Sequence, residues 1–142
     1  MNHLVILRPG PMEKILQGTK TIESRFGINR PPAWQCTEGD TLYLKVTGGN
    51  ILATARARQI ERYDELDAVT LYALESRYRD GVHGGVRNLD YWLDGMRRGV
   101  RYAVFIHLED LRECLIPASQ LPATLPYASA WIARFQPPHA AS

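Results

Sequence analysis

The sequence predicts an α+β fold, a small mixed β-barrel with flanking helices, in 142 residues. Short strand-like segments alternate along the chain with segments that have helical spacing of apolar residues. One predicted strand, residues 51–60, has only small side chains on one face, which suits a tightly curved barrel. Its two faces alternate between alanines and polar residues: Ala53, Ala55 and Ala57 against Thr54, Arg56 and Arg58.

The first half of the chain contains most of the predicted barrel. Residues 3–7 form a strand, and Pro11 suits the first turn of a helix over 11–17 that Gly18 ends in a left-handed cap. Alternation predicts further strands at 20–26 and 41–47, and Gly48-Gly49-Asn50 forms a hairpin turn into the strand at 51–60.

The second half is predicted to add helices and a central strand. Asp64 caps a helix that runs to about Tyr78 with Leu66, Val69, Ala73 and Leu74 on its buried face. A glycine-rich segment, 79–87, is expected to be a mobile loop and a candidate lid, and a short helix follows around residues 89–96. Residues 101–108 are nearly all apolar or β-branched, typical of a strand buried on both faces. Residues 130–135 fit a strand or a helix.

Length and composition fit one globular domain over residues 1–135 with a disordered tail at 136–142. No apolar run approaches a membrane span, and no signal peptide is visible, so we expect no membrane partner and a cytoplasmic location. Cys36 and Cys114 match no metal or redox spacing and are expected to be inert thiols. The four histidines show no metal-binding spacing, and we expect no metal and no cofactor; His107 is expected to be a core residue.

The basic charge lies in the first half of the chain. Residues 1–60 carry eight basic and four acidic residues, whereas residues 61–142 carry nine basic and eleven acidic ones. Of the 17 basic residues 14 are arginines, whose planar fork matches phosphate. The composition therefore permits an anionic ligand without requiring one.

Charged and hydroxyl side chains that could form a functional site are most concentrated in one octet, Gly18-Thr19-Lys20-Thr21-Ile22-Glu23-Ser24-Arg25. It matches the Gly-x-Lys-x-x-Glu-x-Arg pattern of the ASCH domain family, and Gly39-Asp40 then opens a hydrophobic strand in the order expected of that family. The chain thus resembles the ASCH domain family of the PUA-like superfamily, clearly over residues 3–60 and more weakly to about residue 116. The resemblance implies a PUA-like barrel with a functional cleft between the barrel and the first helix.

Within the octet, Lys20 is the leading candidate, since the resemblance places the matching lysine in that cleft. The alternative is that the lysine has only a capping role, because the negative end of the helix dipole favours a cation at this position. Glu23 shares a strand face with Arg25, so it is either a functional carboxylate or the partner of a structural ion pair. Strict alternation puts Lys20 and Glu23 on opposite faces, and the two meet only if the start of the strand twists or bulges.

One branch of the resembled family comprises small bacterial amidohydrolases that act on acetylcytidine and related acylated nucleosides. They are described as using a lysine, a threonine three residues later and a glutamate from a later helix. Lys20 matches the lysine and Glu75 is the candidate for the glutamate, but Glu23 stands where threonine is expected. Hydrolysis of an acylated nucleoside or of RNA would then use Glu23 or Glu75 as general base and Lys20 to stabilise the oxyanion.

The preferred interpretation is recognition of RNA or a modified nucleotide, which PUA-like domains generally bind. Basic groups would hold phosphate, and aromatic rings would stack on bases. A protein-interaction module using the same cleft is a third interpretation. The candidate ligand-binding residues are Arg8, Lys20, Thr21, Arg25, Trp34, Tyr43, Lys45, Arg56 and Arg58; Trp92 is a further stacking candidate for which core packing is favoured.

Overall fold

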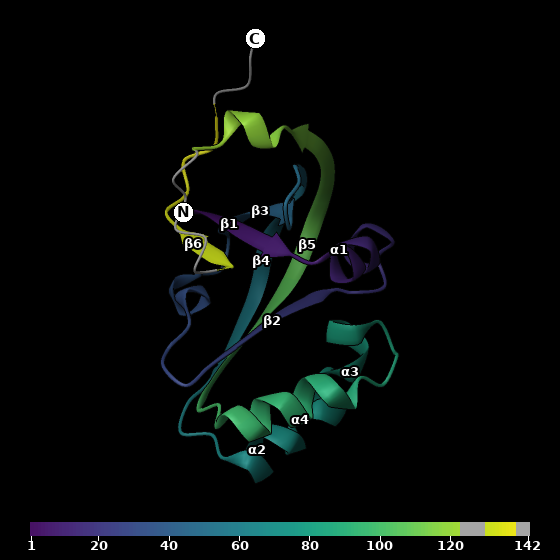
Figure 1. The fold of residues 1–142 in the computed structure, drawn as a ribbon, viewed down its shortest axis with the longest axis vertical. Coiled ribbons are helices and arrows are strands. Elements are labelled where there is room, and N and C mark those ends of the chain that lie inside the picture. Colours follow the sequence, from purple (N-terminus) through teal and green to yellow (C-terminus); the bar gives the residue numbers. More distant parts are fainter. Residues whose placement is uncertain (123–129, 139–142) are drawn as a thin grey trace.

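A single six-stranded sheet in the order β2-β5-β4-β3-β1-β6 organises the computed structural model, which describes residues 1–122 and 130–138 (Figure 1). The strands are β1 Asn2–Leu7, β2 Ile22–Gly27, β3 Thr41–Val46, β4 Ile51–Tyr63, β5 Tyr102–Ile116 and β6 Trp131–Ala133. The helices are α1 Pro9–Leu16, α2 Ala68–Ala73, α3 Glu75–His83 and α4 Leu89–Arg98, with short 3-10 turns η1 Pro32–Gln35 and η2 Ala118–Gln120.

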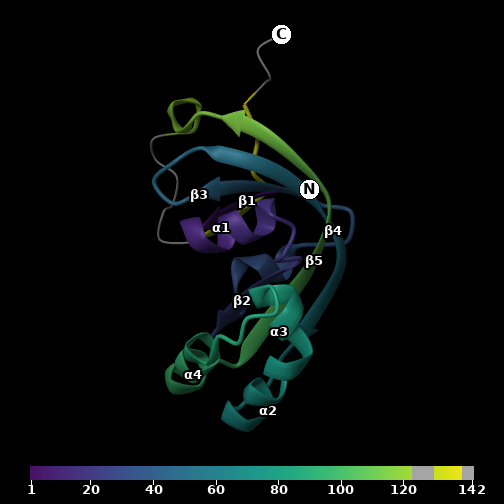
Figure 2. The same ribbon diagram turned by 90° about the vertical axis from the view of Figure 1, so that its right-hand side faces the viewer.

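The sheet is mixed and strongly curled. β1 pairs with β3 in parallel, and the other neighbouring strands are antiparallel. β4 and β5 are the longest strands and run the length of the molecule, bending as they go (Figures 1 and 2). Their pairing shifts register at three points, and such bulges bend strands. The predicted α+β fold with a small mixed barrel and flanking helices is confirmed, with the barrel formed as a curled six-stranded sheet, a half-barrel.

Three hydrophobic clusters cover the faces of the sheet, and the smallest packs Leu4 and Ile51 against Leu121 and Phe135. The inner core packs α1, through Met12 and Ile15, against β1, β3 and β4, and it contains the three alanines of β4 as predicted. The second core packs α2, α3 and α4 against the opposite face of β2 and β5, where Tyr78 stacks on Phe105 with ring centroids 3.6 Å apart. β2 therefore lies between α1 and the layer formed by α2, α3 and α4. The octet, residues 18–25, lies at this junction.

The helix predicted from Asp64 to Tyr78 is divided into two in the structure. Asp67, not Asp64, is the N-cap of α2, because its carboxylate accepts from the Thr70 amide while the Thr70 hydroxyl accepts from the Asp67 amide. Val69, predicted to be buried, is 77% exposed, and Leu71 is buried instead. The change of cap shifts the helical register, so a different set of apolar residues faces the sheet.

The glycine-rich segment 79–87 is also different from its prediction. Residues up to His83 belong to α3, and only then does Gly84 end the helix with a φ of 65°. The helix includes Gly81, where any side chain would collide with Ile22 of β2, so glycine permits close helix-to-strand packing. The candidate lid is thus largely a packed helix.

The remaining predictions differ mainly at element ends. β2 begins at Ile22 rather than at residue 20, α1 begins at Pro9, and β5 continues eight residues past 108 to Ile116. Residues 130–135 form the strand β6, and His107 is half-buried at the surface of the sheet rather than in a core. The predicted tail, 136–142, lies outside the described residues from 139 onward.

Among the described residues, none of the helices is long and apolar enough to cross a membrane.

A buried polar network fastens the first strand to the turn before β3. Asp40 accepts hydrogen bonds from His3 Nε2 at 2.8 Å, from the Thr37 amide at 2.9 Å and from the N-terminal ammonium at 3.1 Å. Burial alone would raise the pKa of Asp40, but these hydrogen bonds outweigh it and lower the pKa to about 2. Ionised Asp40 is therefore an integral part of the fold.

This network predicts acid sensitivity. Because the folded pKa of Asp40 lies below the unfolded value of about 3.9, its contribution is complete above pH 4 and is lost as the pH falls from about 4 to about 2. We expect the Asp40→Asn variant to be destabilised at pH 7 by roughly 1–3 kcal/mol in urea unfolding. Its stability should also decline less than that of the native chain between pH 5 and 2, and exposed Glu38→Gln is the control. Parallel pH profiles for Asp40→Asn and the native chain would contradict this assignment.

The packing of α3 on β2 gives a second prediction. A Cβ at Gly81 would lie 2.3 Å from Ile22 Cδ1, so Gly81→Ala should lower the free energy of unfolding by about 1–3 kcal/mol, as overpacked sites do. In an Ile22→Ala background, which is destabilised on its own account, Gly81→Ala should cost less than it does in the native chain. Ser76→Ala, at an exposed position of the same helix, is the control and should be neutral or stabilising. Equal effects of Gly81→Ala and Ser76→Ala would exclude the close contact.

Candidate functional site

The site begins where α1 ends. Gly18 adopts a φ of 82°, the left-handed cap expected from the sequence. The turn lets the amides of Thr19 and Lys20 both donate to the Lys14 carbonyl, at 3.0 and 3.1 Å. The next amide, of Thr21, donates to the Gly81 carbonyl of α3 at 2.8 Å. Residues 19–21 therefore form a short bridge from α1 to α3, and Lys20 lies on it before β2 starts.

Lys20 points into the protein and is 5% exposed. Its Nζ donates to the carbonyls of Ile22 at 2.7 Å and Val82 at 3.1 Å, and lies 3.8 Å from Glu23 Oε2. Burial lowers the pKa of Lys20 below its usual value, although the negative charge of Glu23 opposes that shift. The ammonium thus lies between two backbone carbonyls and a carboxylate.

Glu23 is the second buried charge of the site, 5% exposed. Its Oε1 accepts from Arg25 Nε at 3.3 Å, as the shared strand face predicted. Its Oε2 is buried and has no hydrogen-bond partner among the described residues, since 3.8 Å to Lys20 is too long for one. Lys20 and Glu23 meet despite their odd spacing because Lys20 precedes the strand, so alternation does not apply to it.

Arg25 makes structural contacts at this site. Its two terminal nitrogens donate to the carbonyls of Ala130 and Ile6, both at 3.1 Å, and its guanidinium lies 5.5 Å from the Trp131 ring centroid. It therefore joins β2 to β1 and to the chain entering β6 while it orients Glu23. These contacts leave Arg25 less available to a phosphate than the sequence suggested.

The opposite face of β2 carries a second polar group. The hydroxyls of Ser24 and Tyr91, a residue of α4, lie 2.7 Å apart, and burial raises the pKa of Tyr91 to about 12. Nearby, His83 Nε2 accepts from Trp92 Nε1 at 3.0 Å, and burial together with Lys20 and Lys14 lowers the pKa of His83 to about 4. His83 is therefore a neutral acceptor near pH 7, and Trp92 is a core residue.

Glu75 is buried at the start of α3 but pairs with arginines. Arg79 donates to both of its carboxylate oxygens, at 3.0 and 2.8 Å, and Arg87 lies 3.7 Å away. The hydrogen bonds from Arg79 lower the pKa of Glu75. Within the described part of the chain, no hydrogen bond or ion pair joins Glu75 to Lys20 or Glu23. The structure thus brings together two of the three candidate catalytic residues.

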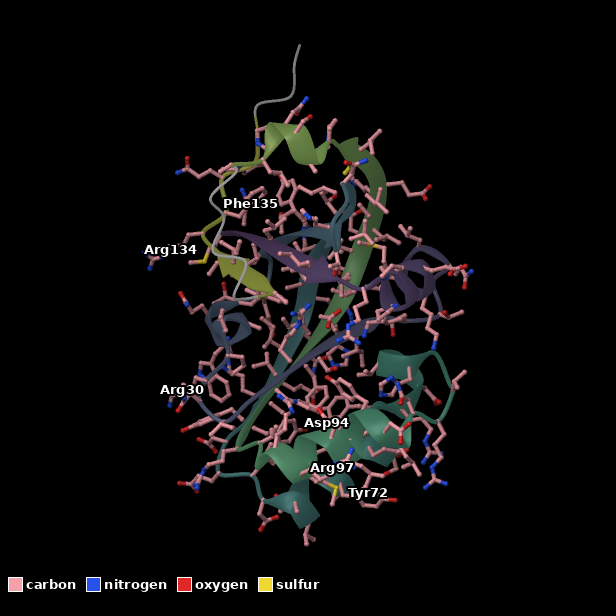
Figure 3. The ribbon with its side chains drawn as sticks, in the orientation of Figure 1. Arg30, Tyr72, Asp94, Arg97, Arg134 and Phe135 are labelled. Carbon is pink, nitrogen blue, oxygen red and sulfur yellow. The ribbon has the colours of Figure 1, made fainter. Side chains whose placement is uncertain are left out.

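The other candidate binding residues do not gather in one groove. Tyr43 packs on Phe135 on the outer face of the sheet, and Lys45 is buried, with its Nζ donating to the Val46 carbonyl at 3.3 Å. Trp34 lies against Tyr102 with the Arg30 guanidinium 5.1 Å from its ring centroid. Figure 3 shows Arg30 on the side of the molecule opposite α1. Arg8, Thr21, Arg56 and Arg58 are exposed.

A small cavity of about 130 Å³ opens beside Lys20. It lies between the end of α1 and the part of β5 beyond its pairing with β2, which ends at His107. Its walls are mainly apolar; the lining residues are Ile15, Gly18, Lys20, Thr21, Leu108, Glu109, Asp110 and Leu111. Of the predicted binding residues, Lys20 and Thr21 thus share a cavity.

One group of side chains has the composition of a metal site. His3, Cys36 and Asp40 place ligand atoms within 4.8 Å of one another. However, Trp131 Nε1 can only donate, and it lies 3.1 Å from His3 Nδ1, so that nitrogen accepts and the His3 proton is on Nε2, facing Asp40. Burial raises the pKa of Cys36 to about 12, which disfavours the thiolate a metal requires. The donor set fits a hydrogen-bond network better than a metal.

Several groups at the site could not be recognised from the sequence. The Val82 and Gly81 carbonyls and the Tyr91 hydroxyl come from helices far along the chain, and Asp110 reaches the cavity from β5. None of them belongs to a motif. The one signal was Gly81, whose lack of a side chain permits the approach of α3.

No family model matches the chain, and no curated protein matches it. Solved structures do. The ASCH protein of Zymomonas mobilis is 20% identical, with a TM-score of 0.65 over 84% of this chain and 75% of that one. A variant of that protein, in which one tyrosine is replaced by phenylalanine, aligns with the same TM-score and covers 77% of that chain. A protein described only as hypothetical, PH0355, is 22% identical, with a TM-score of 0.55 over 77% of this chain and 98% of that one.

These likenesses cover 77–84% of this chain. At 20–22% identity they concern the fold. The chain therefore has the fold of the ASCH domain proteins, as its resemblance to that family predicted.

Proposed function

We propose that this chain binds a nucleobase-containing ligand, RNA or a modified nucleotide, where Lys20 and Glu23 meet beside α1. The observation that carries the proposal is the free Oε2 of Glu23, a buried carboxylate oxygen without a hydrogen-bond partner among the described residues. Leaving such an atom unpaired costs about 1–3 kcal/mol, and more for a charged group. Natural proteins keep few such groups, and each calls for an explanation.

A nucleobase edge matches this arrangement. Glu23 Oε2 accepts hydrogen bonds, and Lys20 Nζ, 3.8 Å away, donates them. Every base has a hydrogen-bond donor next to an acceptor on its pairing edge, so the pair fits bases in general. The apolar walls of the adjoining cavity suit the flat face of a base.

The site is also held in place before a ligand arrives. Arg25 orients the Glu23 carboxylate, and the carbonyls of Ile22 and Val82 orient the Lys20 ammonium. Preorganised groups lose little entropy on binding. The ASCH fold and the resemblance to PUA-like domains, which generally bind RNA or modified bases, support the same ligand class.

Hydrolysis of an acylated nucleoside is the second candidate, favoured by the contact between Lys20 and Glu23. In that reaction Glu23 Oε2 would accept a proton from the attacking water while Lys20 donates to the developing oxyanion. Glu75 is a poor base for it, because the hydrogen bonds from Arg79 keep its carboxylate paired and lower its pKa. The hydrolytic mechanism would therefore depend on Lys20 and Glu23 alone.

The binding proposal is tested with the four ribonucleosides, titrated by calorimetry or by NMR. At least one should bind, and Glu23→Gln should weaken it by roughly 10- to 100-fold, the usual value of a paired contact to a base edge. Glu13→Gln on the exposed part of α1 is the control and should leave affinity unchanged. Thermal unfolding of each variant separates loss of binding from loss of fold. Unchanged affinity in a folded Glu23→Gln protein would contradict the proposal.

The hydrolase alternative is tested by incubating the protein with acetylcytidine and following cytidine by chromatography. If the chain is hydrolytic, Lys20→Ala and Glu23→Ala should each reduce turnover by roughly 100-fold or more, within the range of general acid–base and oxyanion contributions. Turnover that survives both substitutions would exclude these residues as the catalytic groups, and binding of acetylcytidine without turnover would favour recognition.

A further inference from the structure

Asp110 on β5 lines two cavities. The first is the apolar cavity beside Lys20, and the second, of about 220 Å³, lies on the outer side of β4 and β5. The residues of the outer cavity are Thr41, Thr54, Ala55, Arg56, Asp110 and Arg112.

A bulge explains the position of Asp110. Thr54 pairs with Arg112 and Arg56 with Glu109, so β5 has one more residue than β4 over this stretch. Asp110 has a φ of 52°, a conformation that aspartate tolerates better than most residues. Since β2 pairs with β5 only as far as His107, this edge of β5 is uncovered by β2. Asp110 therefore lies at an open edge, where a ligand can pass from one face of the sheet to the other.

The outer cavity has the chemistry of a phosphate site. Arg56 and Arg112 supply guanidinium donors, and Thr41 and Thr54 supply hydroxyls. Among residues 1–122 and 130–138, no hydrogen bond or ion pair occupies the Arg56 side chain. Arg112 contacts Asp110 through Nε at 3.2 Å, which leaves its terminal nitrogens for another acceptor.

We propose that the ligand of the Lys20–Glu23 site is a phosphorylated ribonucleotide that crosses the edge of β5. Its base lies toward Lys20, its ribose hydroxyls donate to Asp110, and its phosphate accepts from Arg56 and Arg112. Lys20, Asp110 and the two arginines would thus contact base, ribose and phosphate, in the order in which these groups are joined in a nucleotide. A carboxylate is the usual acceptor for a ribose hydroxyl, and arginine is the usual donor to phosphate. This inference rests on the proposed function, because it begins from a base bound at Lys20 and Glu23.

The experiment compares each ribonucleoside with its 3′- and 5′-monophosphates, its deoxy analogue and a short single-stranded RNA, by calorimetry at low and moderate salt. One monophosphate, or the RNA, should bind at least roughly 10-fold more tightly than the nucleoside, as expected of charge-assisted contacts to phosphate. The double variant Arg56→Ala/Arg112→Ala should abolish that preference. Arg97→Ala, on the exposed surface of α4, is the matched control and should keep the preference (Figure 3). A mononucleotide that binds as tightly as RNA identifies a free nucleotide as the ligand, and RNA that binds more tightly identifies a strand.

Asp110 is tested separately. Asp110→Gly keeps the left-handed backbone accessible and removes the carboxylate, so it should reduce the preference for ribose over deoxyribose by about 10-fold. Asp110→Asn retains an acceptor and should keep part of that preference. Nucleosides that bind with no gain from phosphate, or a gain that survives Arg56→Ala/Arg112→Ala, would overturn this inference and leave the proposed function standing. Absence of binding by nucleosides, nucleotides and RNA alike would instead refute the proposed function.

Discussion

The buried ammonium of Lys20 is the interaction on which the site depends. It ties the bridge after α1 to a carbonyl of β2 and to a carbonyl of α3, and it lies beside Glu23. Glu23 in turn pairs with Arg25, which binds the backbone of β1 and the residue before β6. Lys20, Glu23 and Arg25 therefore form a chain of ion pairs that connects α3 to β1 and to the residue before β6.

This chain of ion pairs also affects the stability of the fold. Removing one member of a buried ion pair leaves the other charge uncompensated, which is strongly destabilising. Oε2 of Glu23 nevertheless has no hydrogen-bond partner among the described residues, so the hydrogen bonding of the network is incomplete. The missing hydrogen bond is why we propose a ligand at Glu23 and a structural role for Arg25, although both belong to one motif.

The shape of the sheet decides what can reach these residues. Small alanines on the inner face of β4 let it curl around α1, and the bulges shared with β5 bend both strands. β2 covers only the first part of β5, so the rest of that edge stays open next to the Lys20 cavity. Access to the cavity beside Lys20 thus results from the unequal lengths of two neighbouring strands.

The fold class, the left-handed cap at Gly18, the alanine face of β4 and the pairing of Glu23 with Arg25 could all be predicted from the amino-acid sequence. These features follow from local rules: glycine adopts positive φ easily, and alternate residues of a strand share a face. The boundary between α2 and α3 and the helical state of residues 79–83 were predicted wrongly, because competing caps and packing against Ile22 decide them. Tertiary packing also determines which polar residues meet. Lys20 and Glu23 converge because the chain enters β2 after Lys20, while Glu75 turns to Arg79 one helical turn away. These pairs are close in the chain, but whether they form depends on where β2 begins and on how α3 packs against it, which no local pattern encodes.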